Sequence, residues 1–358
     1  MTIWGEIALD GARRTVTVER EFAASASELW SALTDPERLA RWIGRYEAYE
    51  GGYRLRMGGP GVDAIVLGRV IDCEPERRIV IAWQFSRSGE NEGETEVEVS
   101  VSSVGDDRSR LTLVHRRVQA VTASVYGAGW EDALTHLSRE VGDERSSVGE
   151  LGYVGGAADP AAFDAALDEY RRVEAALVPA STVRVEAGSG VHLERLLDAP
   201  MDAVWDVLTT PERIGRWLWP VVSWPDDPVR ERPLRMGDMF RLGDANVPDG
   251  VHDMEVLALE PGRLISFAWG PDRSAVTIRL SETVEGTLFV LDQEAIPDVF
   301  GAGRMRSAPD FAAGWHSLVD GLTLLLNGLS VPETAALWEA AYEVYAEHDA
   351  GTGSSTSD

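Results

Sequence analysis

Hydrophobic and polar residues alternate in short runs along the chain, and glycine, proline and acidic residues separate these runs. After a strand at 15–23, the pattern predicts two short helices, one ending at Thr34 and one beginning at Pro36. Ser25 or Ser27 is suited to cap the first of these helices. The alternation that follows predicts strands at about 53–58, 62–74, 78–86, 94–104 and 108–118.

A long helix is predicted to close this first unit, at about 122–141. Trp130, Leu134, Leu137 and Val141 recur in it at the helical period and would face the sheet. The closely spaced strands imply an antiparallel meander. The expected fold class is therefore α+β, in which a curved antiparallel sheet wraps around a long C-terminal helix and two short helices follow the first strand.

The same pattern occurs twice in the sequence. Residues 19–42 match residues 194–217 without a gap at a constant offset of 175, and 11 of the 24 aligned positions are identical. Chance would give about one or two identities. Gly129-Trp130 and Gly314-Trp315 follow in the same order near the end of each copy. The sequence therefore predicts two tandem copies of one domain.

The 358 residues divide accordingly. We expect domain 1 at 1–142 and domain 2 at 183–330, each large enough to form its own core. Residues 143–182 are expected to be a linker that contains an amphipathic helix at 160–178. A C-terminal helix is expected at 331–349, followed by a disordered tail at 350–358.

Composition narrows the possible functions. The formal net charge of −27 repels phosphate backbones and anionic lipid surfaces, so neither nucleic acid nor membrane insertion is expected. All 33 basic residues are arginine, which excludes Schiff-base chemistry on lysine and a phosphate-binding lysine loop. Cys73, the single cysteine, excludes an internal disulfide and is expected to be a buried strand residue.

The sequence contains none of the common catalytic or phosphate-binding motifs. The sequence contains no Gly-x-Ser-x-Gly elbow, no His-Glu-x-x-His zinc motif and no glycine-rich phosphate loop, so no catalytic residue, metal or cofactor is predicted. The N-terminus has no secretory signal pattern, and the apolar stretches are too short to span a bilayer. We therefore expect a cytoplasmic protein.

Several landmarks together resemble a known family. A strand that carries Glu-Arg precedes a run from Leu29 to Trp42, Leu-Trp-x-x-Leu-Thr-x-Pro-Glu-Arg-Leu-x-x-Trp, which recurs from Val204 to Trp217, and Gly-Trp begins the last helix in both copies. This pattern resembles the activator of heat shock protein 90 ATPase homologue family of the START-like (SRPBCC) superfamily, over about 14–142 and 188–330. The resemblance implies two tandem helix-grip domains, each with an apolar cavity. Since the superfamily includes lipid carriers, polyketide aromatase/cyclases and hormone receptors, the resemblance does not select one activity.

One arginine in each repeat is predicted to face the interior. Arg20 alternates in phase with Val16 and Val18, and Arg195 with Leu193 and Leu197. A buried guanidinium needs a carboxylate or an anionic ligand. Each arginine could therefore anchor an acidic ligand in a cavity, or form a structural pair with a carboxylate or with backbone carbonyls of its own domain.

Aromatic and titratable residues complete the candidate set. Trp83 and Trp269 lie in phase with buried strand residues and could line a cavity or simply fill the core. His115 shares a strand face with two leucines and could be a general base or a structural histidine. The candidate ligand-binding residues are Arg20, Trp83, His115, Trp130, Arg195, Trp269, Trp315 and Asp292, of which Asp292 is expected to be the counterpart of His115.

Three functions remain open after these observations. The first is a carrier or sensor that binds a small apolar or acidic-apolar molecule in the two cavities without chemistry of its own. The second is an enzyme of the aromatase/cyclase or hydrolase type that uses the cavity to orient a substrate. The third is a co-chaperone-like protein that binds a protein partner through its outer surface. The first is the preferred hypothesis.

Overall fold

The computed structural model of the chain falls into two compact units that divide between Glu174 and Ala175, and each unit is described here by itself. The structure describes residues 5–57, 64–87, 89–142, 159–178, 181–185, 188–225, 232–243, 250–270, 273–294, 308–330 and 335–353, without the side chains of 181–189 and 348–353.

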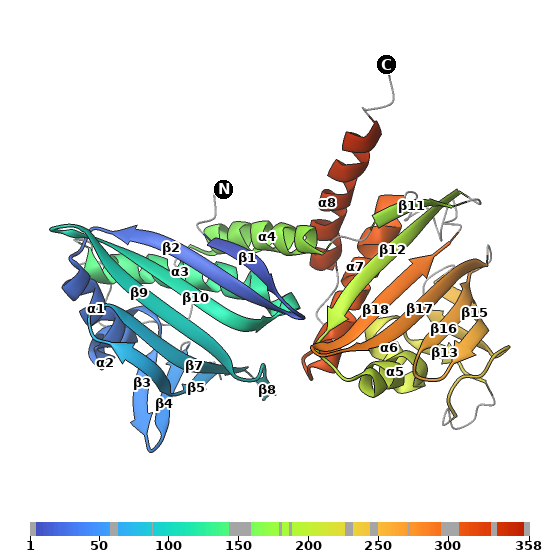
Figure 1. Cartoon of the computed structure of the whole chain (residues 1–358), viewed down its shortest axis with the longest axis horizontal. Coiled ribbons are helices and arrows are strands. Elements are labelled where there is room, and N and C mark those ends of the chain that lie inside the picture. The colour runs from blue at the N-terminus through green and yellow to red at the C-terminus, as the bar shows by residue number, and fades with distance from the viewer. Residues whose placement is uncertain are drawn as a thin grey trace. The chain divides into compact units, whose positions relative to one another are not determined.

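Domain 1 is one antiparallel sheet with a long helix packed against it (Figure 1). Its strands are β1 (Gly5–Asp10), β2 (Arg13–Phe22), β3 (Arg45–Tyr49), β4 (Gly52–Met57), β5 (Ala64–Gly68), β6 (Val70–Glu74), β7 (Arg78–Arg87), β8 (Glu90–Asn91), β9 (Thr95–Gly105) and β10 (Arg108–Gln119). Its helices are α1 (Ala26–Thr34), α2 (Pro36–Trp42), α3 (Ala123–Val141) and α4 (Pro160–Leu177). The sheet order is β1-β2-β10-β9-β7-β5-β4-β3, and β6 and β8 pair with β7.

Domain 2 repeats this plan. Its strands are β11 (Ser181–Val185), β12 (Gly188–Leu197), β13 (Val221–Ser223), β14 (Met239–Gly243), β15 (Val251–Glu260), β16 (Leu264–Trp269), β17 (Ser274–Thr283) and β18 (Gly286–Gln293). Its helices are α5 (Met201–Thr209), α6 (Pro211–Trp217), α7 (Ala308–Leu326) and α8 (Ala335–Gly353). The antiparallel order is β11-β12-β18-β17-β16-β15-β14-β13, and α7 packs on β12 as α3 packs on β2.

The predicted α+β fold, with two tandem helix-grip domains, is thus confirmed. Ser25 caps α1, since its side chain accepts a hydrogen bond from the Glu28 amide, and Asp35 caps α2 by accepting from two amides. One detail differs: the two short helices follow the second strand, because β1 and β11 each form a hairpin with the next strand and escaped prediction. Cys73 was predicted to be buried but is exposed, because β6 lies outside the main strand order and pairs only with β7.

The helix predicted within the linker packs on domain 1. Asp159 caps it by accepting hydrogen bonds from two amides of the first turn. The Tyr170 ring lies against Gly127 of α3, where a Cβ atom would approach the ring to 2.7 Å, and its hydroxyl donates to Glu131 Oε1 at 2.7 Å. Arg14 and Glu174 form a buried ion pair of 2.8 Å. These contacts make α4, as far as Glu174, part of the first compact unit.

A corresponding helix follows domain 2. In α8 the Tyr345 hydroxyl lies 2.6 Å from His316 Nδ1 of α7. Tyr170 and Tyr345 are separated by the same offset of 175 as the first repeat, and Glu131 and His316 directly follow the paired residues Trp130 and Trp315. The helix extends to Gly353, beyond the expected end at 349, so residues 350–353 are helical and not part of a disordered tail. Residues 354–358 and the predicted linker at 143–158 lie outside the described residues.

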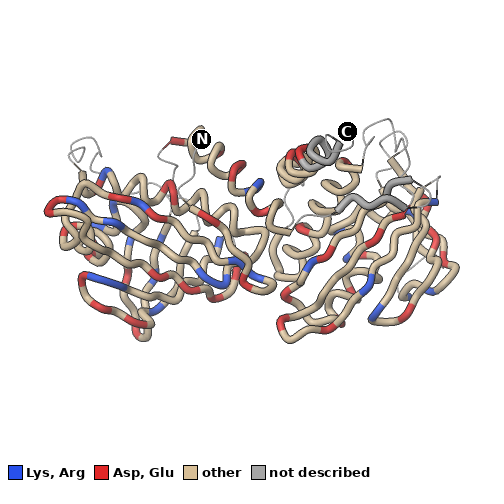
Figure 2. The backbone as a smooth tube through the Cα atoms, turned by 45° about the horizontal axis from the view of Figure 1, so that its top comes forward, with Lys and Arg blue, Asp and Glu red and all other residues tan. Residues whose placement is uncertain are grey.

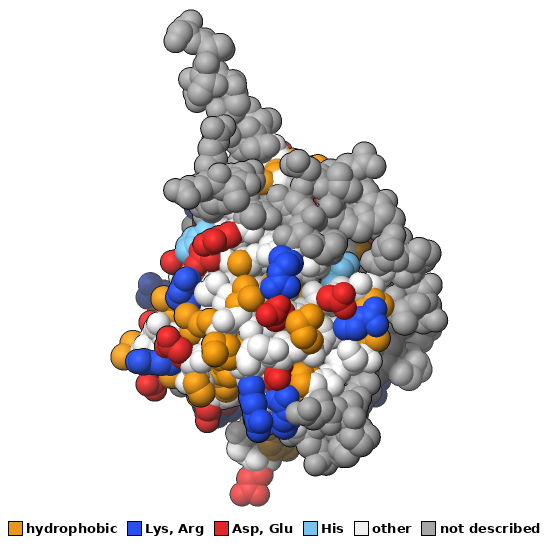
Figure 3. Space-filling view, turned by 90° about the vertical axis from the view of Figure 1, so that its right-hand side faces the viewer, with side chains coloured by type: hydrophobic (Ala, Val, Ile, Leu, Met, Phe, Trp, Pro, Cys, Tyr) orange, Lys and Arg blue, Asp and Glu red, His pale blue; other side chains and the backbone are white. Residues whose placement is uncertain are grey.

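Arginine, aspartate and glutamate residues occur along the backbone of both units (Figure 2). On the face shown in Figure 3, arginine and acidic side chains alternate with apolar ones over the described residues. Among the described helices, none has both the length and the apolar character of a membrane span.

Candidate functional site

A series of hydrogen bonds links helix α3 to the sheet of domain 1. The Trp130 indole N–H donates to His115 Nδ1 at 3.1 Å, and His115 Nε2 lies 2.7 Å from Thr95 Oγ1. The Thr95 hydroxyl donates in turn to the Trp83 backbone carbonyl at 2.8 Å. Because an indole only donates and the threonine proton is already used, His115 must carry its proton on Nε2. The geometry therefore assigns a neutral tautomer.

His115 is fully buried, and burial lowers its pKa from 6.5 to about 3. Its ring packs edge-on against Tyr126, with centroids 4.4 Å apart, and against Trp130. Both ring nitrogens are hydrogen-bonded within the domain, so neither is available to take a proton from a bound molecule. This arrangement favours the structural reading of His115 over the general base.

Domain 2 has an equivalent series of hydrogen bonds, made by different side chains. The Trp315 indole N–H donates to Gln293 Oε1 at 2.6 Å, and Gln293 Nε2 donates to Ser274 Oγ at 2.9 Å. The Ser274 hydroxyl donates to the backbone carbonyl of Glu294 at 2.7 Å. Gln293 pairs with Val276 as His115 pairs with Val97. Gln293, and not Asp292, is therefore the counterpart of His115.

The expectation for Asp292 was wrong by one residue. Successive strand residues point to opposite sides of a sheet, so this difference moves the side chain to the outer face. There the partly exposed Asp292 carboxylate lies 2.6 Å from His192 Nδ1 and also pairs with Arg279. The other predicted aromatic residues do come together: ring centroids are 5.1 Å apart for Trp83 and Trp130, and 5.1 Å for Trp269 and Trp315.

The two interior arginines are held within their domains. Arg20 is half-buried on β2, and its guanidinium donates to the Thr135 hydroxyl of α3 at 3.0 Å. Burial lowers the pKa of Arg20, and the nearby Glu131 carboxylate opposes this effect. Arg195 is buried, donates to the Val178 carbonyl at 2.6 Å and lies 3.6 Å from Asp320. These contacts correspond to the structural alternative for both residues.

A cavity of about 230 Å³, here called the inner cavity, lies between the sheet, α2 and α3 of domain 1. Leucine, isoleucine and valine side chains form most of its wall, together with Trp83 and Trp130, and no charged side chain of the described residues lines it. Three polar groups in the wall are already hydrogen-bonded: the Trp42 indole donates to the Ala32 carbonyl and the Tyr53 hydroxyl to the Ala82 carbonyl, both at 2.9 Å, and the Trp130 indole donates to His115. The Trp83 indole nitrogen, by contrast, is buried without a hydrogen-bond partner among the described residues. Burial raises the pKa of Tyr53, which keeps this hydroxyl neutral.

A second cavity of about 380 Å³, here called the outer cavity, lies on the other side of Trp83 and Trp130. Its wall also includes Glu92, Tyr126 and Phe163. Of the predicted residues of this domain, Trp83 and Trp130 line both cavities, whereas Arg20 and His115 line neither.

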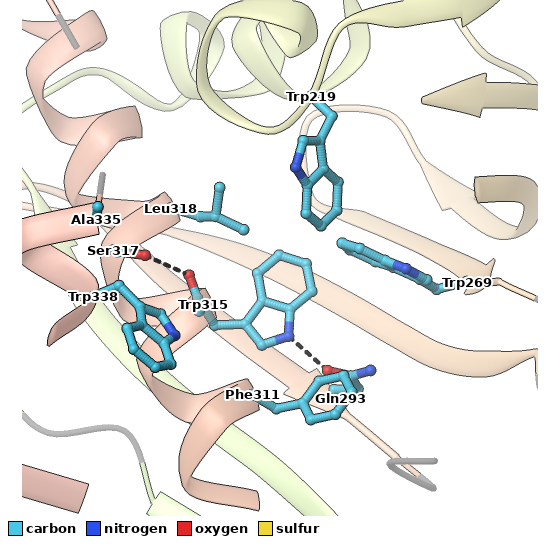
Figure 4. Close-up of a pocket in the computed structure, with 10 residues that line it drawn as sticks. Trp219, Trp269, Gln293, Phe311, Trp315, Ser317, Leu318, Ala335 and Trp338 are labelled. Carbon is cyan, nitrogen blue, oxygen red and sulfur yellow. Dashed lines mark hydrogen bonds between the residues drawn. The ribbon is translucent and has the colours of Figure 1, made fainter. Parts of the chain in front are cut away.

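Domain 2 has a cavity of about 360 Å³ at the position equivalent to the outer cavity, here called the tryptophan cavity (Figure 4). The indoles of Trp219, Trp269, Trp315 and Trp338 lie around it, and the centroids of Trp219 and Trp269 are 4.8 Å apart. Gln293 also lines it, but its amide is held by Trp315 and Ser274.

Sequence reasoning missed Glu92, Tyr126, Phe163, Trp219 and Trp338 as cavity residues. One signal was available, because Phe163 and Trp338 lie at the offset of 175 that defines the repeat. Among the residues described, no group of three histidine, cysteine or carboxylate side chains gathers as a metal site.

A curved antiparallel sheet, a long closing helix and cavities between them define each half as a START-like, helix-grip domain. The chain belongs to the family described as "Activator of Hsp90 ATPase homolog 1-like protein", whose model matches residues 23–142 and 198–327. The resemblance seen in the sequence is thus confirmed in both copies. A comparison with curated proteins found no match.

Solved structures with similarity to the chain include CalU16 from Micromonospora echinospora. Its solution structure is 27% identical, with 49% of this chain and 93% of that chain covered and a TM-score of 0.37. DynU16, described as a protein of the dynemicin biosynthetic locus, is 17% identical, with 94% and 98% covered and a TM-score of 0.34. MLL2253 from Mesorhizobium loti is 28% identical, with 39% and 97% covered and a TM-score of 0.32.

Proposed function

We propose that the protein is a carrier or sensor that binds small, neutral, apolar molecules in the inner cavity of domain 1. The observation that carries this proposal is the chemistry of the cavity wall, in which the described residues include no charged side chain and the polar groups of Trp42, Trp130 and Tyr53 are already hydrogen-bonded. Such a wall stabilises a ligand by burying its apolar surface, and it provides no partner for a charged group of the ligand.

The size of the cavity narrows the ligand class. A dry apolar cavity of about 150 Å³ is large enough for benzene, and sites for drug-sized ligands begin at about 300 Å³. The inner cavity, at about 230 Å³, lies between these limits. A neutral molecule with one or two rings therefore fits best, and indole is a suitable probe. Arg20 does not supply a cationic anchor for an acidic ligand, because its guanidinium is held by Thr135 and does not line the cavity.

The test is a calorimetric titration of the whole chain with indole and with indole-3-acetate. We expect indole to bind at least about tenfold more tightly, since the acid would bury a carboxylate without a cationic partner. Val99→Phe, which places a larger side chain in the cavity wall, should abolish indole binding. The matched control is Ile278→Phe, at the equivalent strand position of domain 2, which should leave indole binding in domain 1 intact. Preference for the acid, or unchanged binding in the Val99→Phe protein, would contradict the proposal.

Arg20→Ala gives an independent check on the same site. We expect indole affinity to change less than about twofold, while the free energy of unfolding of domain 1 falls by about 1 kcal/mol through loss of the Thr135 hydrogen bond. Arg195→Ala should cost more, about 3 kcal/mol in domain 2, because it leaves the Asp320 carboxylate largely buried without its arginine. Denaturant unfolding and the titration measure the two effects separately. A large loss of indole affinity in Arg20→Ala would instead show that Arg20 belongs to the ligand site.

A further inference from the structure

The outer cavity of domain 1 and the tryptophan cavity of domain 2 occupy the same place in the fold but differ in chemistry. Each lies beside a tryptophan pair and an aromatic residue of the following helix, Phe163 in α4 or Trp338 in α8. At two matching positions, Tyr126 and Asp132 of α3 in domain 1 correspond to Phe311 and Ser317 of α7 in domain 2. The first copy therefore carries a phenol and a carboxylate where the second carries an apolar ring and a neutral hydroxyl.

Glu92 is the central polar group of the outer cavity. It lies between β8 and β9, where the Tyr126 hydroxyl donates to its Oε2 at 2.7 Å, and Gln119 Nε2 donates to its backbone carbonyl at 3.1 Å. Burial raises the pKa of Glu92, and burial together with this carboxylate raises the pKa of Tyr126 well above 10.0. The Tyr126 hydroxyl therefore remains a donor, and Oε1 of Glu92 accepts no hydrogen bond from the described residues.

Charge in the cavity is not balanced from within. Arg87 also lines the wall, but its side chain is exposed and makes no ion pair with Glu92 in the described part of the chain. Asp132 adds a second carboxylate to the wall, with His136 Nε2 at 3.8 Å. A largely buried carboxylate without a cationic partner is costly, and a cationic ligand would remove this cost. The net charge of −27 favours the approach of cations to the whole molecule.

A donor in the same wall is also unused. The indole nitrogen of Trp83 is buried, lines the cavity and has no hydrogen-bond partner within the described residues. It lies toward the Tyr126 hydroxyl and lowers the pKa of that group, but the pair lacks the geometry of a hydrogen bond. An ammonium group cannot accept a hydrogen bond from this donor, but the π face of an aromatic ring can, so the unused indole N–H favours a ligand that carries a ring.

We propose that the outer cavity of domain 1 is a second binding site, for an organic amine that carries an aromatic ring. The ammonium group donates to Glu92 Oε1, and the ring packs against Trp130 and Phe163, which border the same space. The volume of about 380 Å³ falls in the range of small-molecule sites. This site is separate from the inner cavity and does not depend on the function proposed for it.

The experiment compares 2-phenylethylamine with 2-phenylethanol, which has the same ring and a hydroxyl in place of the ammonium group, by calorimetric titration of the whole chain. We expect the amine to bind at least about tenfold more tightly, as for a charge-assisted pair in a partly buried site. Glu92→Gln keeps the shape of the side chain and removes its charge, so it should remove this preference and leave binding of the alcohol unchanged. Equal affinities of the two probes for the unmodified protein, or no detectable amine binding, would overturn the proposal.

Three variants make the result specific. Glu94→Gln removes a nearby exposed carboxylate that pairs with Arg69 outside the cavity, and it should leave the amine preference intact. Tyr126→Phe installs the residue that the chain already carries at Phe311, so a folded protein is expected, with the amine preference reduced but not lost. Val99→Phe should block indole and leave the amine unaffected, which separates the two sites. A preference that survives Glu92→Gln in a protein with normal circular dichroism would assign amine binding elsewhere and refute the site.

Discussion

Replacing His115 with glutamine should make domain 1 far less sensitive to acid while changing its stability near pH 7 only slightly. Glutamine already holds this position in domain 2, where Gln293 accepts from Trp315 and donates to Ser274. The variant can therefore reproduce the hydrogen bonds that His115 makes with Trp130 and Thr95. What it removes is the proton equilibrium of the imidazole.

The sign of the effect follows from the pKa of His115, which is about 3 in the folded protein and 6.5 in the unfolded chain. Between these two pH values His115 is protonated in the unfolded chain but neutral in the folded domain. The free energy of unfolding therefore decreases as pH falls below 6.5. The loss reaches about 1.4 kcal/mol for each pH unit and at most about 5 kcal/mol near pH 3. Denaturant unfolding at several pH values, with the variant subtracted from the unmodified protein, isolates this contribution from that of the carboxylates.

Two histidine variants serve as controls. Gln293→His should introduce the same acid sensitivity into domain 2. His192→Gln should have a small effect of opposite sign, because the Asp292 carboxylate raises the pKa of His192, and the stabilisation is present below pH 6.5 and lost as pH rises. Parallel curves for His115→Gln and the unmodified protein would show that His115 is not held neutral.

Trp130→Ala should produce the largest loss of stability of any single change in domain 1, about 3–5 kcal/mol in the free energy of unfolding. The substitution removes a buried aromatic side chain that contacts Trp83 at a centroid distance of 5.1 Å and leaves His115 Nδ1 without its donor. Trp130→Phe keeps most of the apolar surface and loses only the donor, so a cost of about 1–3 kcal/mol is expected.

Guanidinium unfolding of the whole chain, followed by circular dichroism, checks this prediction. Because the chain has two compact units, two transitions are expected, and Trp315→Ala identifies the transition of domain 2 by shifting it alone. Trp130→Ala should shift only the other transition. A loss below about 1 kcal/mol in Trp130→Ala, or an equal shift of both transitions, would contradict the packing described for this residue.

The fold was largely predictable because its signals are local. Strand alternation, the caps at Ser25 and Asp35 and the period of Trp130, Leu134 and Leu137 act within a few residues, and the repeat showed the same order of elements twice. One local signal was overlooked: β1 and β2 are joined at Asp10-Gly11, where Gly11 has a φ of 60°, and an Asp-Gly pair is typical of a tight hairpin turn.

The site was predictable only in part. Strand phase and the Gly-Trp match correctly placed Trp83, Trp130, Trp269 and Trp315 in the interior. Phase alone could not decide between Asp292 and Gln293, because the offset between the repeats drifts and a single residue reverses the face. Nor could it show that Thr135 lies opposite Arg20, since that contact depends on how α3 crosses the sheet. Cavities arise from such packing and leave no direct trace in sequence.

The tyrosine contacts of α4 and α8 indicate which segment of the chain was duplicated. Tyr170 meets Glu131 and Tyr345 meets His316 at matching places, although both helices lie beyond the segments that the family model matches. Two independent acquisitions of a helix would not be expected to agree in spacing and in contact. The ancestral gene segment that was copied therefore already encoded the extra helix, and the group that contacts the tyrosine now differs between the copies, a carboxylate in one and an imidazole in the other.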